Sequence, residues 1–390
     1  MKVPKKSLKT GLASAGLLAG AYLLFWPVPI EPASWHPPRD PGFEGPFAVN
    51  DRLGGVRRIG AGLCPGPEDL AVDAEGRVHA GLEDGTIARI VPESGRVERW
   101  TSTGGRPLGL DFDPEGNLVV ADGVKGLLSV DPKGAVTVLS TGHEGERYLF
   151  LNDVDVAGDG TIYFTDSSAR FGPDRYKEEI LDHRPSGRLL AYDPNTRGTR
   201  VVASDLYFAN GVAVADDGRS VLVAETTRYR VLRSWIRGSR SGEIEVFVEN
   251  LPGFPDGIST DSEGKHWLAL YSPRSLLLDL ILPRPSLREI LMRLPSVLQP
   301  RPNRYGAVVC FDRGAKIIHN LQDPRGGFAP VTSVEAAGGI LYLGSLEGSS
   351  IGSIPIPAPA PLQDPGGLEM RAEAFELREQ HMLHRRILNL

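Results

Sequence analysis

A short pattern of alternating apolar residues that ends at a turn glycine recurs along the chain. In FANGVAVADDG, Phe208 to Gly218, the apolar positions alternate from Val212, and Asp217–Gly218 closes the run as a hairpin signal. A second apolar run, SVLVAE, follows the glycine. Further copies of this unit begin at Pro67, Pro107, Leu151, Pro255 and Val331. The pattern therefore predicts a strand–turn–strand unit that is used six times.

Six copies of such a unit predict an all-β fold, a six-bladed β-propeller, rather than a sandwich. Each blade has four strands, and the innermost strand begins near the central channel. The sixth blade lacks a strand, because the sequence turns into the Pro-rich PAPAPLQDPGG after SSIGSIPI. We expect Gly54–Gly60 to supply the missing outer strand and close the ring. The propeller is then residues 54–356, with insertions at 170–187 and 272–306.

The second residue of each unit occupies the same place, the start of an inner strand, so these side chains converge on one mouth of the channel. In chain order they are Glu68, Leu108, Asn152, Asn210, Asp256 and Thr332. Two carboxylates and two amides are hard oxygen donors, which suit Ca²⁺. Glu68, Asn152, Asn210 and Asp256 are therefore predicted to bind calcium. No His or Cys stands in the ring, which argues against zinc or copper.

The alternative is that these residues only form turns, because Asn-Gly and Asp-Gly are common turn dipeptides. Against it, four polar side chains keep one register, and a buried, unpaired carboxylate is costly. Four further acidic residues have two interpretations: Asp153 and Asp155, and Asp166 and Glu225 at the ends of the second strands. They either bind a second ion or belong to the outer shell of the metal, or they are ordinary polar strand ends.

The first residues differ from the rest of the chain. MKVPKKSLK carries four lysines, and the uncharged TGLASAGLLAGAYLLFWPVPI follows. About 20 apolar residues cross a bilayer as a helix, and lysines before the span hold that end in the cytoplasm. Residues 1–32 are therefore predicted to form a single-pass membrane anchor, followed by a linker at 33–53, with the propeller on the non-cytoplasmic side. A cleaved signal peptide is the alternative, and both export the propeller.

Three further segments carry expectations. The insertion at 272–306 is rich in Leu and Arg with helix-like spacing, and it lies on a membrane surface, roofs an apolar pocket or packs on the side of the propeller. The insertion at 170–187 is interpreted as a rim loop, and residues 357–390 as a Pro-rich linker and helical tail. In an oxidising compartment Cys64 and Cys310 either pair or stay buried thiols.

Composition narrows the possible partners. The formal net charge is −6 and no basic stripe with interleaved aromatic residues occurs, so a nucleic-acid partner is not expected. The 46 glycines and 32 prolines are typical of many short strands joined by turns. The histidines are scattered, and no G-x-S-x-G motif is present.

Five stretches carry a resemblance to a known family. They are GRPLGLDFDPEGNLVVADGVKGLLSVDP, FLNDVDVAGDGTIYFTDSSARF, SGRLLAYDPNTRGTRVV, FANGVAVADDGRSVLVAETTRYRVLR and FVENLPGFPDGI. Together they resemble the strictosidine synthase-like group, which includes the adipocyte plasma membrane-associated proteins. More distantly they resemble the gluconolactonase and paraoxonase propellers. The resemblance runs from about Gly66 to Ser345.

The resemblance implies a calcium-dependent hydrolase that acts on a small-molecule lactone, aryl ester or phosphotriester. The family's ligand motifs match at Glu68, Asn152, Asn210 and Asp256, and the family gives the position of Asp256 a second role as nucleophile or base. Because Asp256 is the best-placed nucleophile, we expect an arylesterase- or lactonase-like enzyme. A binding or scaffold propeller that keeps the metal only for structure is the rival from another class.

Two departures from the family pattern limit the chemistry. Strictosidine synthase depends on a glutamate in the sixth blade, where this chain has Thr332, and Glu335 lies on the other face of an alternating strand. A condensing enzyme is therefore disfavoured. Paraoxonases use a histidine at the position of Leu108, so their histidine-assisted chemistry is not expected.

Overall fold

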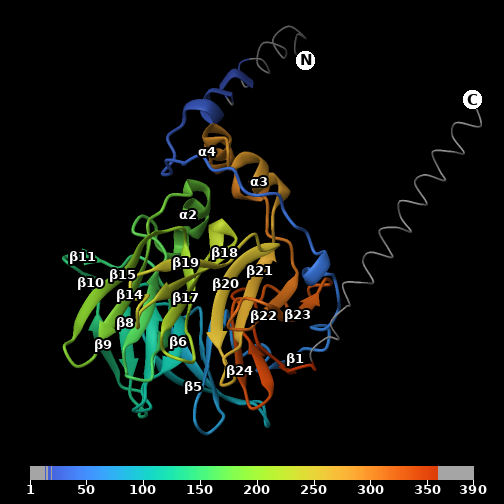
Figure 1. Cartoon of the computed structure of the whole chain (residues 1–390). Coiled ribbons are helices and arrows are strands. Elements are labelled where there is room, and N and C mark those ends of the chain that lie inside the picture. The colour runs from blue at the N-terminus through green and yellow to red at the C-terminus, as the bar shows by residue number, and fades with distance from the viewer. Residues whose placement is uncertain (1–13, 15, 19, 359–390) are drawn as a thin grey trace, which may run out of the picture. The chain divides into compact units, whose positions relative to one another are not determined.

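The computed structural model describes residue 14, residues 16–18 and residues 20–358. Six four-stranded antiparallel sheets surround a central channel, which confirms the six-bladed β-propeller (Figure 1). The first three blades contain, from the channel outward, β2 Leu70–Val72, β3 Val78–Gly81, β4 Thr86–Val91 and β5 Arg96–Ser102; β6 Pro107–Phe112, β7 Leu118–Asp122, β8 Gly126–Val130 and β9 Val136–Ser140; and β12 Leu151–Val156, β13 Ile162–Asp166, β14 Gly187–Asp193 and β15 Gly198–Leu206.

The other three blades continue the same order around the ring. They contain β16 Ala209–Val214, β17 Ser220–Glu225, β18 Arg230–Trp235 and β19 Ile244–Val248; β20 Gly253–Thr260, β21 His266–Pro273, β22 Gly306–Phe311 and β23 Ile317–Asp323; and β24 Val334–Ala337, β25 Ile340–Leu343, β26 Ile351–Pro355 and β1 Arg57–Ile59. A short ribbon, β10 Gly142–His143 with β11 Glu146–Arg147, projects between the second and third blades.

The sixth blade is closed by the N-terminal strand, as the sequence predicts. β1 pairs antiparallel with β26, with Arg57 opposite Ser353 and Ile59 opposite Ile351. Ile59 and Ile351 are buried together in the hydrophobic cluster that joins the sixth blade to the first. The ring therefore has no open edge between its first and last blades.

Neighbouring blades pack face to face, and this explains the apolar runs that follow each turn. Every residue of β7 and of β17 is buried, because adjacent blades cover both faces of these middle strands. The outer strand β9 is largely exposed, and it mixes Thr137 and Ser140 with valine and leucine. The turn that joins β6 to β7 needs a left-handed residue, and Gly116 supplies it with φ of 84°.

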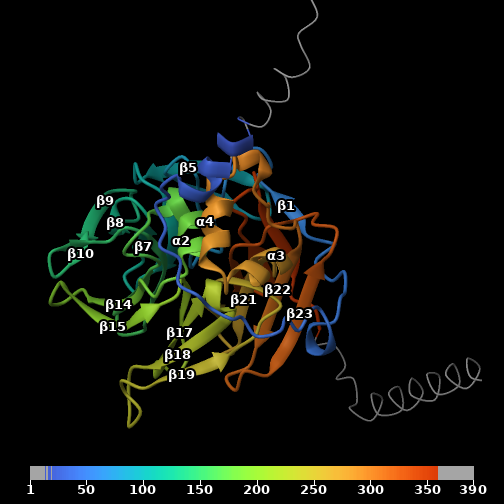
Figure 2. The ribbon, with the colours of Figure 1, turned by 90° about the horizontal axis from the view of Figure 1, so that it is seen from above.

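The two insertions form a cap over one mouth of the channel. The cap consists of residues 170–187, with η2 Pro173–Arg175 and α2 Tyr176–Asp182, and residues 272–306, with α3 Leu276–Ile281, α4 Pro285–Arg293 and η4 Ser296–Leu298. Seen from above, the three helices lie across the centre of the ring (Figure 2). The prediction of a rim loop at 170–187 missed α2.

The cap has a small hydrophobic core of its own. Phe171 and Leu181 pack with Leu278 and Leu291 and with Ile30 of the N-terminal segment. The fully buried guanidinium of Arg288 donates to the carbonyl oxygens of Leu181 and Ala33 and so joins α4 to α2 and to this segment. The segment from Val28 to Ala33 is therefore part of the folded unit.

The predicted single-pass anchor is wrong. No helix among the described residues is long and apolar enough to cross a membrane. Helical residues 20–25 end before Pro27 and Pro29, and Arg293 of α4 donates to the carbonyl oxygens of Leu23 and Trp26. The uncharged run counted in the prediction thus includes extended residues that pack on the cap. Residues 1–13, 15 and 19 lie outside the described residues.

The structure also bears on the predictions for the two cysteines and for the C-terminal tail. Cys64 and Cys310 are free and buried in different hydrophobic clusters, which excludes a disulfide between them in this structure. Residues 357–390 separate from the propeller as a second unit. Apart from 357 and 358, the predicted linker and helical tail lie outside the described residues.

Candidate active site

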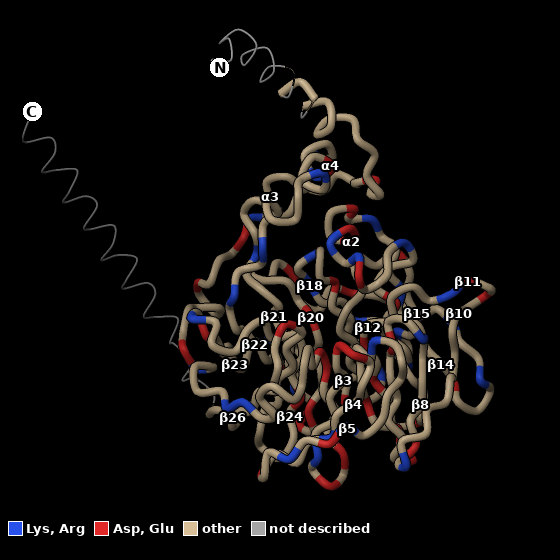
Figure 3. Tube along the Cα trace, turned by 180° about the vertical axis from the view of Figure 1, so that it is seen from behind, with Lys and Arg blue, Asp and Glu red and all other residues tan. Residues whose placement is uncertain are grey.

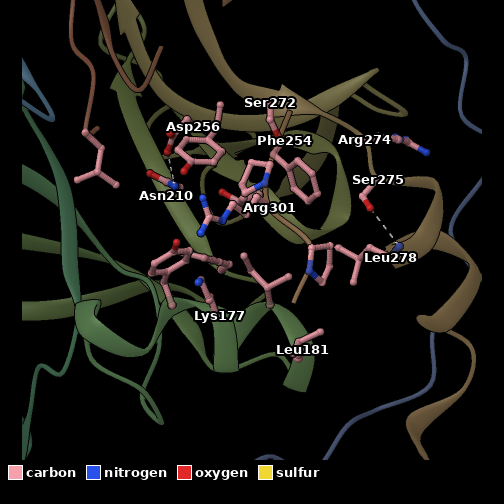
Figure 4. Close-up of a pocket in the computed structure, with 18 of the residues that line it drawn as sticks. Lys177, Leu181, Asn210, Phe254, Asp256, Ser272, Arg274, Ser275, Leu278 and Arg301 are labelled. Carbon is pink, nitrogen blue, oxygen red and sulfur yellow. Dashed lines mark hydrogen bonds between the residues drawn. The ribbon is translucent and has the colours of Figure 1, made fainter. Parts of the chain in front are cut away.

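A pocket of about 720 Å³ lies between the channel mouth and the cap. Its floor contains the four predicted polar residues, Glu68, Asn152, Asn210 and Asp256, each at most 8% exposed. Its walls are mostly apolar and come from the cap helices and from three phenylalanines, Phe150, Phe208 and Phe254. The close-up in Figure 4 shows Asn210 and Asp256 side by side at the floor. We call this cavity the apolar pocket.

Three of the four floor residues stand at an irregularity of their strand. The pairing of β12 with β13 shifts between Leu151 and Val154, around Asn152. The same shift surrounds Asn210 in β16 and Asp256 in β20. A bulge re-aims the side chain that it contains, and bulges are frequent beside active sites. The repeated bulge thus turns each floor residue toward the channel mouth.

Hydroxyl groups fasten the inner strands to one another at this level. Thr165 Oγ1 and Ser167 Oγ, from the third blade, donate to the carbonyl oxygens of Asn210 and Ala209 at 2.7 and 2.6 Å. Thr226 Oγ1 donates in the same way to the Pro255 carbonyl oxygen at 2.7 Å. Each hydrogen bond links one blade to the start of the inner strand of the next blade. Together these bonds fix the position of the pocket floor.

The two amides use their nitrogens within the protein. Asn152 Nδ2 donates to Ser167 Oγ at 2.9 Å, and Asn210 Nδ2 donates to Asp256 Oδ1 at 2.6 Å. The amide oxygens are left available to a ligand at the pocket floor. This orientation suits a cation and does not suit an anion, because it presents acceptors only.

The two carboxylates are held in an unfavourable environment. Burial raises the pKa of Asp256 to about 8, while the hydrogen bond from Asn210 opposes the rise. Burial and the neighbouring charge of Asp256 raise the pKa of Glu68 well above its usual range. Arg106, which donates to the Gly66 carbonyl oxygen at 3.1 Å, partly offsets the charge of Glu68. A bound cation would remove the repulsion between the two carboxylates.

The donor set fits a hard divalent cation. Two carboxylates and two amide oxygens converge on one floor, and no histidine lines the pocket in the described part of the chain. No group of three or more His, Cys, Asp and Glu able to hold a metal occurs among the described residues, so an ion at this floor would depend on the two amides beside the two carboxylates. Oxygen donors from side chains and water are what Ca²⁺ takes.

The remaining ring positions do not contribute polar ligands to the pocket. Leu108 lines it as an apolar wall. Thr332 turns away and donates from Oγ1 to the Glu68 carbonyl oxygen at 2.7 Å. Glu335 lines a second, smaller cavity and not the apolar pocket.

The second cavity lies farther down the channel and is lined by carboxylates. We call it the channel cavity, and its acidic residues are Asp69, Asp111, Asp153, Asp155 and Glu335. Acidic residues on the inner strands are red in Figure 3. Burial raises the pKa of Asp155 to about 6, and burial with the charge of Asp155 raises the pKa of Asp111. Asp153 and Asp155 accept from backbone amides of β16.

Asp166 and Glu225 are strand ends in ion pairs, as one of the two sequence interpretations holds. Asp166 Oδ2 accepts from Arg188 at 2.7 Å, and Glu225 pairs with Arg230. Each carboxylate also accepts from the backbone that leads into an inner strand, at Phe150 and at Tyr207. They therefore position β12 and β16 without facing the pocket.

Sequence reasoning missed the residues that the cap contributes. Lys177 of α2, Leu276 and Leu277 of α3 and Arg301 after η4 line the pocket. Their spacing follows no repeat, so periodicity carried no signal of them. Only the Leu-rich composition of the 272–306 insertion pointed to an apolar roof, and the structure favours that interpretation.

Fold and site define a class of protein: a six-bladed β-propeller with a ring of oxygen donors beneath a capped apolar pocket. The chain belongs to the strictosidine synthase-like family. Residues 152–239 match the family model "Strictosidine synthase", and residues 45–90 match "Strictosidine synthase-like, N-terminal". Protein STRICTOSIDINE SYNTHASE-LIKE 6 of Arabidopsis thaliana is 37% identical over 314 residues, which cover 78% of this chain and 83% of the relative.

A second group of relatives consists of animal proteins. The adipocyte plasma membrane-associated protein of Salmo salar is 35% identical over 354 residues, 84% of each chain. Among solved structures, a gluconolactonase from Xanthomonas campestris has a TM-score of 0.57 at 19% identity and covers 84% of this chain and 97% of its own. The calcium-binding protein regucalcin from Agrobacterium tumefaciens has a TM-score of 0.54 at 16% identity, covering 76% and 92%. These two likenesses show the fold.

Proposed function

We propose that the chain is a calcium-dependent hydrolase of esters and lactones, with an arylesterase- or lactonase-like reaction at the floor of the apolar pocket. The observation that carries the proposal is the convergence of Glu68, Asn152, Asn210 and Asp256 beneath a cavity large enough for a small-molecule substrate. Fold analogy with a gluconolactonase and with a calcium-binding propeller supports it, although fold alone assigns no reaction.

The four floor residues would hold the calcium ion. When bound, the ion supplies a Lewis acid that polarises the acyl oxygen of the substrate and stabilises the charge that builds on it. The amide nitrogens of Asn152 and Asn210 are already engaged, so their oxygens are preorganised for this role. The apolar walls keep bulk water from the floor and strengthen the electrostatic interactions there.

Asp256 is the residue that acts on the reacting atoms, as a nucleophile or as a base. Its Oδ1 accepts from Asn210, which fixes the carboxylate plane and leaves Oδ2 for the substrate or for water. As a base it takes a proton from water, the hydroxyl adds to the acyl carbon, and the proton passes to the leaving oxygen as the acyl carbon–oxygen bond breaks. A carboxylate beside a cation is a weak base, so substrates with good leaving groups are favoured.

The test compares the full chain with Asp256→Asn on phenyl acetate and a panel of small lactones at saturating calcium. We expect the variant to lose turnover roughly 100-fold or more, because it loses the group that accepts the proton. Asp217→Asn, at an exposed turn, is the matched control and should keep full activity. Circular dichroism and calcium binding must show that Asp256→Asn remains folded and loaded.

Two results would contradict the proposal in different ways. Undiminished turnover by Asp256→Asn would remove the role given to Asp256. A folded, calcium-loaded wild-type chain that turns over none of these substrates would point to the rival class, a binding propeller in which the metal is structural.

A further inference from the structure

The walls of the apolar pocket carry charge of one sign only. Among the residues that line it, the two carboxylates, Glu68 and Asp256, are both at the floor. Above them the lining contains the cationic side chains Lys177, Arg274 and Arg301 and no carboxylate. Arg106 also lines the pocket and interacts with Glu68, so the floor carries charges of both signs while the walls above it carry only positive charge.

Two of these cations are not used by the protein itself. Arg274 donates to the Leu251 carbonyl oxygen at 2.8 Å and to Asn250 Oδ1 at 2.6 Å, so it holds the backbone of the fifth blade. Within the described part of the chain, Lys177 and Arg301 form no ion pair, and Lys177 Nζ lies over the ring of Tyr176, 5.9 Å from its centroid. Figure 4 shows both side chains directed into the pocket, from α2 and from the segment after η4.

The space between the floor and these cations is apolar. Leu108 and Phe254 line its propeller side, and Leu181, Leu278 and Leu291 line its cap side. At about 720 Å³ the cavity exceeds what phenyl acetate or a five-membered lactone fills. A well-matched occupant therefore has an extended apolar body.

We infer that the substrate is an anionic amphiphile: an ester or lactone with an aliphatic body and a carboxylate or phosphate group that Lys177 and Arg301 hold at the mouth. This inference rests on the proposed function and names its substrate class. Lys177 and Arg301 attract the anion to the mouth, away from the floor where Glu68, Asn152, Asn210 and Asp256 converge. The opposite end of the molecule, with the reactive acyl group, then lies at the floor.

The charge arrangement thus gives orientation as well as affinity. Both side chains are exposed, so each contributes modestly to affinity, and the guanidinium of Arg301 can hold a carboxylate or phosphate through two charge-assisted hydrogen bonds. A neutral ester of the same length leaves both cations without a partner and gains nothing from them.

The test uses three 4-nitrophenyl esters with the same eight-carbon chain: the neutral octanoate, the monoester of octanedioic acid, and an octanoate that ends in a phosphate. The full chain is compared with the double variant Lys177→Gln/Arg301→Gln. We expect kcat/KM for the two anionic esters to fall roughly 10- to 30-fold in the double variant, mainly through KM. The neutral ester should change less than twofold, and high salt should shrink the difference.

Arg284→Gln is the matched control, because Arg284 is an exposed cap cation outside the pocket lining. It should leave all three esters unchanged. The preferred anionic ester distinguishes a carboxylate from a phosphate ligand, and a preference for either supports the inference. Equal kcat/KM changes for neutral and anionic esters, or none for any, would overturn it.

Calorimetry with octanoate and octyl phosphate separates this inference from the proposed function. Binding to the wild-type chain that weakens at least tenfold in the double variant supports the ligand class even if no ester is hydrolysed. Hydrolysis of all three esters without any binding preference for the anions would keep the proposed function and overturn the ligand class.

Discussion

At the scale of single residues, an amide stands at the buried end of a strand because its backbone and its side chain are both fixed by neighbouring blades. The Asn210 carbonyl oxygen accepts from Thr165, and its Nδ2 donates to Asp256. The next residue, Gly211, has no side chain because the inner strand of the fifth blade runs against it. A Cβ there would lie 2.4 Å from the Asp256 carbonyl oxygen.

Gly211→Ala is therefore expected to push the strand that carries Asp256 away from the floor. We expect a loss of roughly 1–3 kcal/mol in the free energy of unfolding, since backbone atoms must shift to accept the methyl group. Denaturant unfolding measures it. Gly158→Ala is the control, because a Cβ at Gly158 meets nothing within 4 Å. Equal stability of the two variants would contradict the close packing of the inner strands.

At the scale of elements, the repeat explains how much of the site could be read from the sequence. A strand has a fixed period, so a polar residue at a constant offset before a turn glycine must recur at the same level of each blade. That is why the ring of Glu68, Asn152, Asn210 and Asp256 could be predicted. The bulges that turn Asn152, Asn210 and Asp256 toward the pocket have no comparable periodic pattern in the sequence.

The cap and the N-terminal segment could not be derived in the same way. Their positions depend on tertiary contacts, such as those of Arg288 with Leu181 and Ala33. An uncharged run reads as a membrane span when only its hydropathy is counted. Pro27 and Pro29 and the contact of Ile30 with the cap give it another structure here.

Arg288→Met tests whether the contacts of Arg288 hold the cap in place. The substitution keeps the length of the side chain but leaves the carbonyl oxygens of Leu181 and Ala33 without their donor. We expect limited proteolysis within residues 272–306 to become about tenfold faster, because the opening free energy of the cap falls. The exposed Arg284→Met should be cleaved at the wild-type rate. Unchanged cleavage of Arg288→Met would show that this contact does not hold the cap.

At the scale of the whole molecule, two sets of buried groups make the folded state less stable at opposite ends of the pH range. Burial lowers the pKa of His79 and His266 to about 4, so the folded state resists their protonation and loses stability as the pH falls below about 6.5. Burial raises the pKa of Glu179 to about 7, so the folded state holds its proton more tightly than the unfolded chain does. Stability from Glu179 is complete below about pH 4 and is lost as the pH rises to 7.

Glu179→Gln isolates the effect of Glu179 on stability, because the histidines affect the variant and the wild type equally. As the pH rises from 5 to 8, the free energy of unfolding of the variant should increase relative to that of the wild type by on the order of 2 kcal/mol. Denaturant unfolding at several pH values measures this difference. The exposed Glu115→Gln should show no such gain. A difference between Glu179→Gln and the wild type that is flat with pH, or that favours the wild type as the pH rises, would contradict the assignment.

The central claim is that the ring at the channel mouth uses calcium to hydrolyse esters or lactones. The most direct measurement is turnover of phenyl acetate and a lactone panel by the full chain after chelation and after calcium is restored. The account predicts activity that disappears with the chelator and returns with Ca²⁺. Activity that persists in the metal-free, folded protein would place the chemistry away from Glu68, Asn152, Asn210 and Asp256 and contradict it.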